Sequence, residues 1–530
     1  MLFDHGREDS TPTGFEIRRT VDEAAAERKE WITLLLSTTG NEAQYVHTIL
    51  AVFRDLFDPD ANPNGIVNLG IADNSLCRQE LIKPMSQVEA YRIIGSTHKS
   101  QYFNQNRLSL SAPELTYPNR VHSSARLLDA ICHLVNDVPN ASFRDPSGVA
   151  APKPFVRVKP EHIAVGPGAT SVLDTLFWCL CNAGDGVLMS VPYYNGFDHD
   201  LTFRSEAVIL PVQVPTPTST TVENDSSESA GSGPSFAPDT IKFYVEAYQK
   251  AVEEGISVKA ILVVNPHNPT GGIYPRETLV ELAKFAAEHK LHLVVDEIYA
   301  KSCYQTSDSA KPPSFHSILS IDVEGEAALP PSQVHVVTSA SKDFGINGFR
   351  LGVLISQRNK DLMSAMTGLG ILYQSSAPAG ALWYTWLEDS EFLNWYLAEN
   401  RRRLSVAYEY ITDWFKHHRI PYVPANSGHF VMEDFSRFLK VDASEEGDEK
   451  AMRKAEAELV ARMIEERVFV APGSQYHHPI PGWFRLTFSQ DPTTLKEGLV
   501  RLEKVLGLEE WIGKRPELDL LRDSLPVPTH

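Results

Sequence analysis

Lys342 is the residue of this sequence whose surroundings most strongly indicate chemistry. It follows a β-rich run at residues 334–338, Ser339 and Ser341 precede it, and Arg350 comes eight residues later. A primary amine can form an imine with an aldehyde, while hydroxyl groups and a guanidinium can hold a phosphate dianion. A lysine in a loop is usually only solvated, but this pattern favours a site for an aldehyde that carries a phosphate.

Two further strand ends carry polar side chains of a matching kind. Asn268 follows the apolar run 260–264, and Asp296 ends the apolar run 291–295, with Tyr299 three residues later. Open α/β sheets bind ligands at the carboxyl ends of their strands. Because a buried carboxylate needs a positive partner, Asp296 would suit a protonated pyridine nitrogen, and the Tyr299 hydroxyl could reach a ring oxygen.

A third motif offers a phosphate cradle and a surface for stacking. A glycine-rich turn with Ala169 and Thr170 opens the helical stretch 171–179, so free backbone amides and a hydroxyl are available to a phosphate. Tyr194 follows the apolar strand 186–191 and could stack on a planar ring. Each motif alone is weak evidence for a site, but their occurrence together in this order and spacing is implausible as a coincidence.

The elements between these motifs favour a parallel sheet. Residues 275–290 have the pattern of an amphipathic helix that starts at Pro275, with an apolar stripe at Leu279, Leu282 and Phe285. A strand, a helix and a second strand in this order predict a parallel crossover unit.

In their order and spacing, the motifs resemble those of the fold type I pyridoxal-phosphate (PLP) enzymes, the class I and II aminotransferases. Within them the chain most resembles the 1-aminocyclopropane-1-carboxylate (ACC) synthase-like subgroup. The resemblance runs from about residue 64 to residue 506 and includes residues 64–74, 192–201, 339–352, 397–400 and 481–485. It implies an α/β fold: a large domain with a mostly parallel, seven-stranded-type sheet sandwiched by helices, and a smaller α+β C-terminal domain.

The resemblance also implies roles for the cofactor-binding residues. Lys342 would bind the cofactor and act as acid and base at the substrate α-carbon, and Asp296 would keep the pyridine nitrogen protonated. Tyr299 and Asn268 would hydrogen-bond the ring oxygen, and Tyr194 would stack on the ring face. The expected phosphate-binding set is Ala169, Thr170, Ser339, Ser341 and Arg350, together with Tyr117, which would reach the phosphate of the neighbouring subunit in a homodimer.

Substrate binding is expected from Arg485, Asp73 and Asn268. Arg485 matches the arginine that binds the substrate α-carboxylate, a task that suits a bidentate guanidinium. Asp73 stands where ACC synthases commonly have glutamate, so its carboxylate reaches about 1.5 Å less far. The residues after Tyr117, Pro118 to Arg120, depart from the glycine-containing turn of the family.

These residues predict an enzyme that acts on an α-amino acid through an imine with the cofactor and removal of the α-proton. They do not fix the reaction that follows. An aminotransferase is the first expectation. The alternative is an ACC synthase-like lyase, including carbon–sulfur bond cleavage as in fungal sulfur-metabolite pathways. A catalytically silent interaction protein is a third reading, which the intact Lys342, Asp296 and Arg485 oppose.

Two other features have a plainer interpretation. His267 replaces the small residue usual in its turn, and it is expected to face solvent rather than to titrate near the site. The run from Arg401 to Arg403 lies in a helical pattern and is expected to be a solvated face.

Composition and segment patterns complete the expectations. With 42% hydrophobic residues, a net charge of −19 and five scattered cysteines, the chain is expected to be a cytoplasmic enzyme with a small-molecule substrate, without a metal, nucleic acid or membrane partner. The expected divisions are a helical arm at 1–60, a segment at 61–110 that joins the small domain, a large PLP-binding domain at 111–375 with a flexible insertion at 211–239, a small domain at 376–510, and a tail at 511–530.

Overall fold

The computed structural model describes residues 52, 55–77, 123–138, 153–214, 236–308, 313–442, 447–520 and 523–525. The chain forms two compact units, Met1–Ile66 and Val67–His530. In the first unit, Leu56 bridges Ile66 and Asp58 bridges Asn62. Most of the expected arm at 1–60 lies outside the described residues, as does Tyr117. All site residues considered below belong to the second unit.

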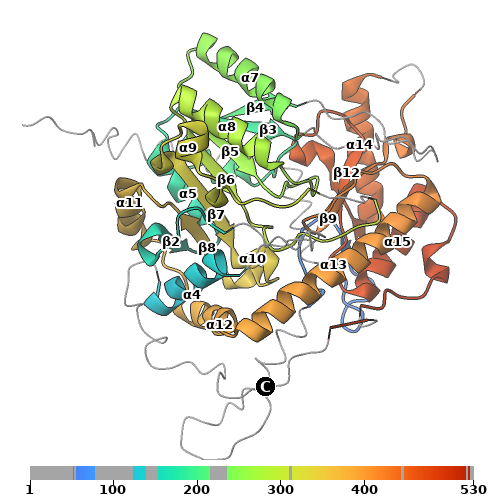
Figure 1. The fold of residues 1–530 in the computed structure, drawn as a ribbon. Helices are drawn as coiled ribbons and strands as arrows, with labels where there is room; N and C mark the ends of the chain where they lie inside the picture. The colour runs from blue at the N-terminus through green and yellow to red at the C-terminus, as the bar shows by residue number, and fades with distance from the viewer. Residues whose placement is uncertain are drawn as a thin grey trace, which may run out of the picture. The chain divides into compact units, whose positions relative to one another are not determined.

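A seven-stranded sheet forms the centre of the second unit (Figure 1). Its order is β2 (Ile163–Gly166), β8 (Gly352–Ile355), β7 (Val334–Ser339), β6 (His292–Asp296), β5 (Val258–Val264), β3 (Gly186–Val191) and β4 (Val208–Gln213). β8 is antiparallel to both of its neighbours, and all the other pairs are parallel. The predicted α/β fold with a mostly parallel, seven-stranded sheet is therefore confirmed.

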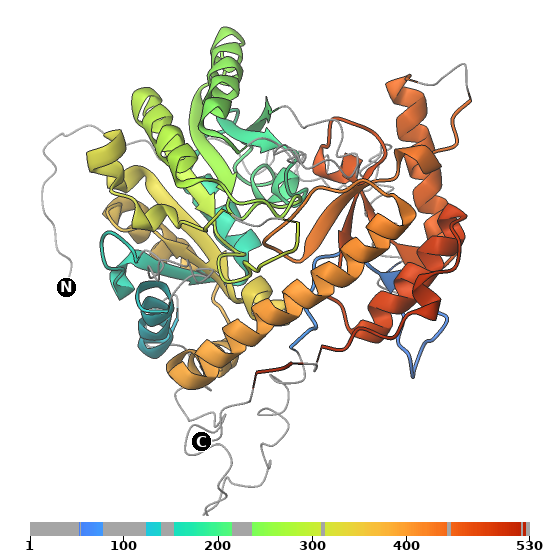
Figure 2. The ribbon, with the colours of Figure 1, turned by 45° about the vertical axis from the view of Figure 1, so that its right-hand side comes forward.

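Helices cover both faces of this sheet (Figure 2). Side chains alternate between the two faces of a strand, so Ile261 and Val263 of β5 enter one apolar cluster while Leu262 and Val264 enter the other. The first cluster includes residues of α4 (Ala125–Asn136), α7 (Ile241–Glu253), α8 (Arg276–His289) and α12 (Ala377–Glu388). The second includes residues of α5 (Ala169–Leu180) and α11 (Lys360–Gly370).

The expected flexible insertion at 211–239 is wrong at both ends. Pro211 and Val212 belong to β4, and Val212 is fully buried. Because β4 is the edge strand, a proline there costs no hydrogen bond within the sheet. At the other end, the ring of Phe236 packs against Tyr274 with centroids 4.5 Å apart. Residues 215–235 lie outside the described part of the chain.

Two smaller sheets form beyond the central one. β9 (Phe430–Asp434), β12 (Trp483–Thr487) and β11 (Ala471–Pro472) make an antiparallel sheet in the order β11-β12-β9. β1 (Val67–Asn68) pairs in parallel with β10 (Val468–Phe469). This pair joins the start of the second unit to the C-terminal part of the sequence. The division into a large and a small domain stays a prediction.

Three long helices accompany these sheets: α13 (Ser390–His418), α14 (Glu449–Glu465) and α15 (Pro492–Leu506). Asp448 caps α14 by accepting hydrogen bonds from the backbone N–H groups of Lys450 and Ala451. Within the described ranges, no helix combines the length and the apolar character needed to cross a membrane.

Candidate active site

The central residues of the predicted site lie at the carboxyl ends of three adjacent strands. Asp296 is the last residue of β6, and Lys342 lies in α10 (Ala340–Asp343), a short helix directly after β7. β6 and β7 are parallel neighbours, with Asp296 opposite Val337. Asn268 follows β5, which pairs with β6 on its other side. Parallel pairing therefore brings Lys342, Asp296 and Asn268 to one edge of the sheet, as the sequence predicted.

The Lys342 amine is half-buried and donates a hydrogen bond to the carbonyl oxygen of Ala72 at 2.6 Å. Burial lowers the pKa of this lysine to about 8; the positive charges of Arg485 and Arg350 act in the same direction, while Asp73 and Asp296 oppose them. A lysine with this pKa is partly neutral near neutral pH, and only the neutral amine can attack a carbonyl or accept a proton.

Asp296 is a buried carboxyl, 5% exposed, whose Oδ1 accepts a hydrogen bond from the backbone N–H of Ile298 at 3.1 Å. Burial raises its pKa to about 7, against the opposing effects of that hydrogen bond and of Lys342. A cation placed beside Asp296 would restore its ionised form. A protonated pyridine nitrogen is such a cation, so this residue fits a bound pyridoxal ring.

The raised pKa of Asp296 predicts how the stability of the cofactor-free protein depends on pH. Its pKa is raised from 3.8 to about 7, so the folded state holds more protons than the unfolded state between these values, and the free energy of unfolding falls as the pH rises through them. Asp296→Asn removes this titration. We expect the loss of stability between about pH 4 and pH 7 to be shallower in the variant by up to about 1.4 kcal/mol per pH unit. Denaturant unfolding at a series of pH values measures both slopes, and equal slopes would refute the prediction.

The predicted phosphate-binding residues converge at the start of α5. Gly168 precedes this helix with a φ of 92° and no side-chain cap, so the first helical N–H groups are available to an anion. A Cβ atom at Gly168 would overlap the guanidinium of Arg350, and one at Gly352 would overlap the backbone of Gly168 and Ala169. Glycine at both positions lets Arg350 and β8 approach the turn. An amide cradle beside a guanidinium fits a phosphate.

The serines of the predicted phosphate site lie on the turn that carries Lys342. Ser339 caps α10 by accepting a hydrogen bond from the backbone N–H of Ser341 at 2.8 Å. Thr170, in the first turn of α5, forms a side-chain hydrogen bond with Asp200, the last residue of α6 (Phe197–Asp200). Burial raises the pKa of Asp200 to about 7. Asp200 carries no recognisable signal in the sequence, because an aspartate in a short polar segment is usually exposed.

Arg485 projects from β12 into the site and is 3% exposed. Its Nη1 donates to Asn268 Oδ1 at 2.8 Å, and its Nη2 donates to the carbonyl oxygen of Gly70 at 2.7 Å. The guanidinium lies 4.6 Å from the ring centroid of Phe430 and 4.5 Å from that of Tyr476. Its Nε is buried and has no hydrogen-bond partner among the described residues. That donor is available to a substrate carboxylate.

Three further predicted residues lie nearby: Asp73 near Lys342, Tyr299 near Asp296, and Tyr194 near Tyr299. Tyr299 is 2% exposed, and its ring lies edge-on to Phe430 at 5.4 Å. Tyr194 follows β3 and is 37% exposed, which leaves its ring accessible for stacking. Asp73 is half-buried and contributes a negative charge near the Lys342 amine.

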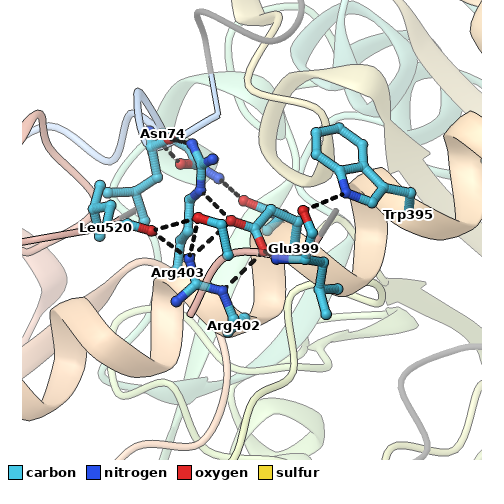
Figure 3. A network of polar contacts seen from close by, with 10 residues as sticks. Asn74, Trp395, Glu399, Arg402, Arg403 and Leu520 are labelled. Carbon is cyan, nitrogen blue, oxygen red and sulfur yellow. Dashed lines mark hydrogen bonds and ion pairs between the residues drawn. The ribbon is translucent and has the colours of Figure 1, made fainter. Parts of the chain in front are cut away.

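The segment that supplies the carbonyls of Gly70 and Ala72 is held by α13 (Figure 3). Asn74 Nδ2 donates to Asn400 Oδ1 at 2.8 Å, and Arg403 Nη1 donates to the carbonyl oxygen of Leu76 at 2.5 Å. Asn74 and Asn400 lie in two of the segments that carry the resemblance, but their contact could not be predicted because the partners are separated by more than 300 residues.

The expectation that residues 401–403 form a solvated face is wrong. Arg403 is 4% exposed and donates to Glu399 at 2.7 Å, and the half-buried Arg402 pairs with the same carboxylate at 2.8 Å. Burial opposes ionisation of Glu399, but hydrogen bonds from both arginines lower its pKa to about 2. Glu399 also accepts from the backbone N–H of Leu525 at 3.2 Å, and Arg402 donates to the carbonyl of Leu520, so the C-terminal segment joins this network (Figure 3).

The expectation that His267 faces solvent is wrong. It is 3% exposed, and its Nδ1 lies 2.8 Å from the hydroxyl of Thr270. Phe236 packs against its ring with centroids 5.1 Å apart. Burial lowers the pKa of His267 to about 3, so the ring stays neutral near neutral pH. The burial of His267 could not be predicted, because the aromatic ring that covers it comes from a distant part of the sequence.

Solved structures share this architecture. Bna3p, a putative kynurenine aminotransferase from Saccharomyces cerevisiae, superposes with a TM-score of 0.64 over 90% of this chain and 98% of its own, at 18% sequence identity. A single mutant of Thermus thermophilus aspartate aminotransferase superposes with a TM-score of 0.58 over 89% of this chain and 98% of its own, at 19% identity. The fold is therefore that of the fold type I aminotransferases.

The sequence gives the family. Residues 121–502 match the family described as aminotransferase class I and II, and the chain belongs to it. It is 34% identical to a probable aminotransferase, aclI, of Aspergillus oryzae over 76% of this chain and 85% of the relative. It is 33% identical to another, gliI, of Aspergillus fumigatus over 84% and 90%. It is 30% identical to ACC synthase 1 of Cucurbita pepo over 90% and 85%. The protein is thus an enzyme of a PLP-dependent family that acts on amino acids.

Proposed function

We propose that this protein is a PLP-dependent aminotransferase in which Lys342 is the catalytic lysine. The observation that carries the proposal is the position of Lys342 near Asp296. Asp296 ends β6, Lys342 follows the parallel neighbour β7, and the two are close enough for each to shift the pKa of the other. The anion cradle at α5 and the buried Arg485 lie around the same pair, which supports one site for a phosphate, a ring and a carboxylate.

The chain's own residues would each perform one task. Pyridoxal phosphate, when bound, supplies a ring that takes up electrons released at the substrate α-carbon. Arg485 binds the α-carboxylate and orients the amino acid. The neutral amine of Lys342 removes the α-proton and returns it. Asp296 provides negative charge beside the ring nitrogen. Asn268 fixes Arg485 through its side-chain oxygen.

A lyase is the second candidate. The 30% identity to an ACC synthase and the carboxylate of Asp73 near Lys342 favour it, because a cationic or polar leaving group can be placed by such a carboxylate. The shorter side chain of Asp73 relative to glutamate favours transamination over ring closure. A cytoplasmic homodimer, in which Tyr117 reaches the phosphate of the neighbouring subunit, is also part of the proposal. Sedimentation of the full chain tests the dimer.

The cofactor proposal is tested by spectroscopy and mass spectrometry. Purified protein supplied with PLP should absorb in the visible range, and borohydride should attach the cofactor irreversibly to the peptide that contains Lys342. Lys284, an exposed lysine paired with Glu281, serves as the internal reference for labelling elsewhere. A protein that binds no PLP would refute the proposal.

A substrate panel then separates the reactions. Amino-group transfer to a keto acid identifies an aminotransferase. Release of pyruvate with a thiol identifies carbon–sulfur cleavage, and release of methylthioadenosine identifies ring closure. Substrates with larger or unusual side chains belong in the panel.

Arg485→Lys tests the assigned carboxylate contact. The variant keeps a positive charge but loses the planar pair of donors. We expect kcat/KM to fall about 10- to 100-fold, mainly through KM, with PLP absorbance unchanged. Arg501→Lys is the control, because Arg501 pairs with Glu497 on α15. An unchanged KM for Arg485→Lys would remove Arg485 from the substrate site.

A further inference from the structure

A buried polar chain behind the site is not used by the proposed function. Asp343 follows Lys342 directly and is 3% exposed. Its Oδ2 accepts a hydrogen bond from the backbone N–H of Lys301 at 3.0 Å, and its Oδ1 accepts one from the hydroxyl of Ser302 at 2.7 Å. Asp343 thereby fastens the turn that carries Lys342 to the turn that carries Tyr299.

His429 extends the chain to a third element. Its side chain is fully buried, and its Nε2 lies 3.2 Å from the Ser302 hydroxyl oxygen. While Asp343 is ionised, Ser302 donates its only hydroxyl proton to it, so the Ser302 oxygen accepts a hydrogen bond from the Nε2–H of His429 in that state. His429 directly precedes β9, and β9 pairs with β12, where Met432 lies opposite Arg485.

The same histidine contacts the site from behind. Its ring lies edge-on to Tyr299, with centroids 5.3 Å apart. With no exposed surface, His429 cannot touch a substrate, and neither can the fully buried Ser302. Any influence on the reaction must therefore pass through Lys342, through Tyr299, or through β9 to the strand β12 that carries Arg485.

The groups around Asp343 favour the ionised form of its carboxyl group. Burial raises the pKa of Asp343 to about 7, while hydrogen bonds from Ser302 and Lys301 and the charges of Lys301 and Arg401 favour its ionised form. A buried carboxylate is costly compared with apolar packing, but the two hydrogen bonds that Asp343 accepts fix its geometry. The Nδ1 atom of His429 is buried and has no hydrogen-bond partner among the described residues. This chain joins the elements that carry Lys342, Tyr299 and Arg485.

We propose that Asp343, Ser302 and His429 are positioning residues, which hold the amine of Lys342 in register with Tyr299 and with the sheet that carries Arg485. The proposal rests on the proposed function, since it assigns Lys342 the reacting amine. Loss of the hydrogen bonds among Asp343, Ser302 and His429 should let α10 shift. The shift should weaken the 2.6 Å hydrogen bond from Lys342 to the carbonyl oxygen of Ala72.

The first test needs no cofactor. Acetic anhydride labels neutral amines, and peptide mass spectrometry gives the rate at Lys342 relative to the exposed Lys284 in the same cofactor-free chain. We expect Ser302→Ala and Asp343→Asn to raise the relative rate at Lys342 about fivefold or more, the effect of losing one hydrogen bond. His429→Phe, which keeps the aromatic packing on Tyr299, should act in the same direction. His429→Gln, which keeps an N–H donor, should restore the rate toward that of the wild type.

The second test uses the loaded enzyme and its substrate. Ser302→Ala should lower kcat about tenfold with KM changed less than about twofold, because Arg485 remains in place. The control is Asp361→Asn, on the exposed first turn of α11, which should match the wild type in both tests. Wild-type labelling rates and wild-type kcat in folded Ser302→Ala and His429→Phe would overturn the proposal and leave the chain a purely structural one. Absence of PLP binding by the wild type would instead refute the proposed function, and the labelling result would still report on the position of Lys342.

Discussion

Replacement of Lys342 by alanine is expected to lower kcat by about 10⁴-fold or more. The variant lacks both the group that bonds to the cofactor and the base that moves the α-proton, and general acid–base catalysis alone contributes about 10²–10⁴-fold. The structure gives this lysine its reactivity, since burial lowers its pKa to about 8. Arg485 and the anion cradle at α5 remain in the variant, so PLP and substrate should still bind.

Single-turnover kinetics with a tight-binding amino acid measure this loss separately from binding. Lys342→Arg is the matched control, because it keeps a charge but offers no neutral amine near neutral pH. It should be as inactive as the alanine variant. Addition of a small primary amine to Lys342→Ala should restore part of the rate, since the cavity left by the side chain admits such a base. Turnover within tenfold of the wild type in either variant would refute the role of Lys342.

The parts of the site that could be predicted from the sequence are those encoded by local patterns. An apolar run that ends in a polar residue marks the carboxyl end of a buried parallel strand, and β3 was predicted with its observed bounds, Gly186–Val191. The positions of Lys342, Asp296 and Asn268 at strand ends followed from the same pattern. Their proximity then followed from the pairing of parallel strands.

The parts that could not be predicted depend on partners far apart in the chain. Arg403 looked solvated because its pair with Glu399, one turn earlier in α13, could equally lie on an exposed helix face. Its burial follows only from the contact of α13 with residues 74–76, where Arg403 donates to the carbonyl oxygen of Leu76. His267 looked exposed because the aromatic ring that covers it comes from beyond a polar stretch. Tyr476, which lies over Arg485, follows no pattern that distinguishes it from any other tyrosine in a loop.

The same limit applies to the polar chain behind Lys342. Asp343 and Ser302 are each ordinary turn residues in the sequence, and only the pairing of β6 with β7 brings them within 2.7 Å of each other. Their role lies in the elements that their buried hydrogen bonds join, and no local pattern of residues encodes it.

Asp296→Asn is expected to cause the second large loss, about 10²- to 10³-fold in kcat. An asparagine has nearly the same shape but cannot pair with a protonated ring nitrogen, and removing one partner of a buried ion pair costs about 3–5 kcal/mol. Binding of PLP should weaken in parallel, because the cation would lose its carboxylate partner at the end of β6.

The two effects of Asp296→Asn can be separated by measuring kcat at saturating PLP and the dissociation constant of PLP by fluorescence titration. Asp296→Glu is the informative companion, since it keeps the charge but changes its reach, and it should retain more PLP affinity than Asp296→Asn. The order of PLP affinity should therefore be wild type, Asp296→Glu, Asp296→Asn. Asp296→Asn could instead bind PLP as tightly as the wild type and turn over at the same rate. The buried carboxyl at the end of β6 would then not face the ring, and the position of Lys342 near Asp296 would no longer support a pyridoxal site.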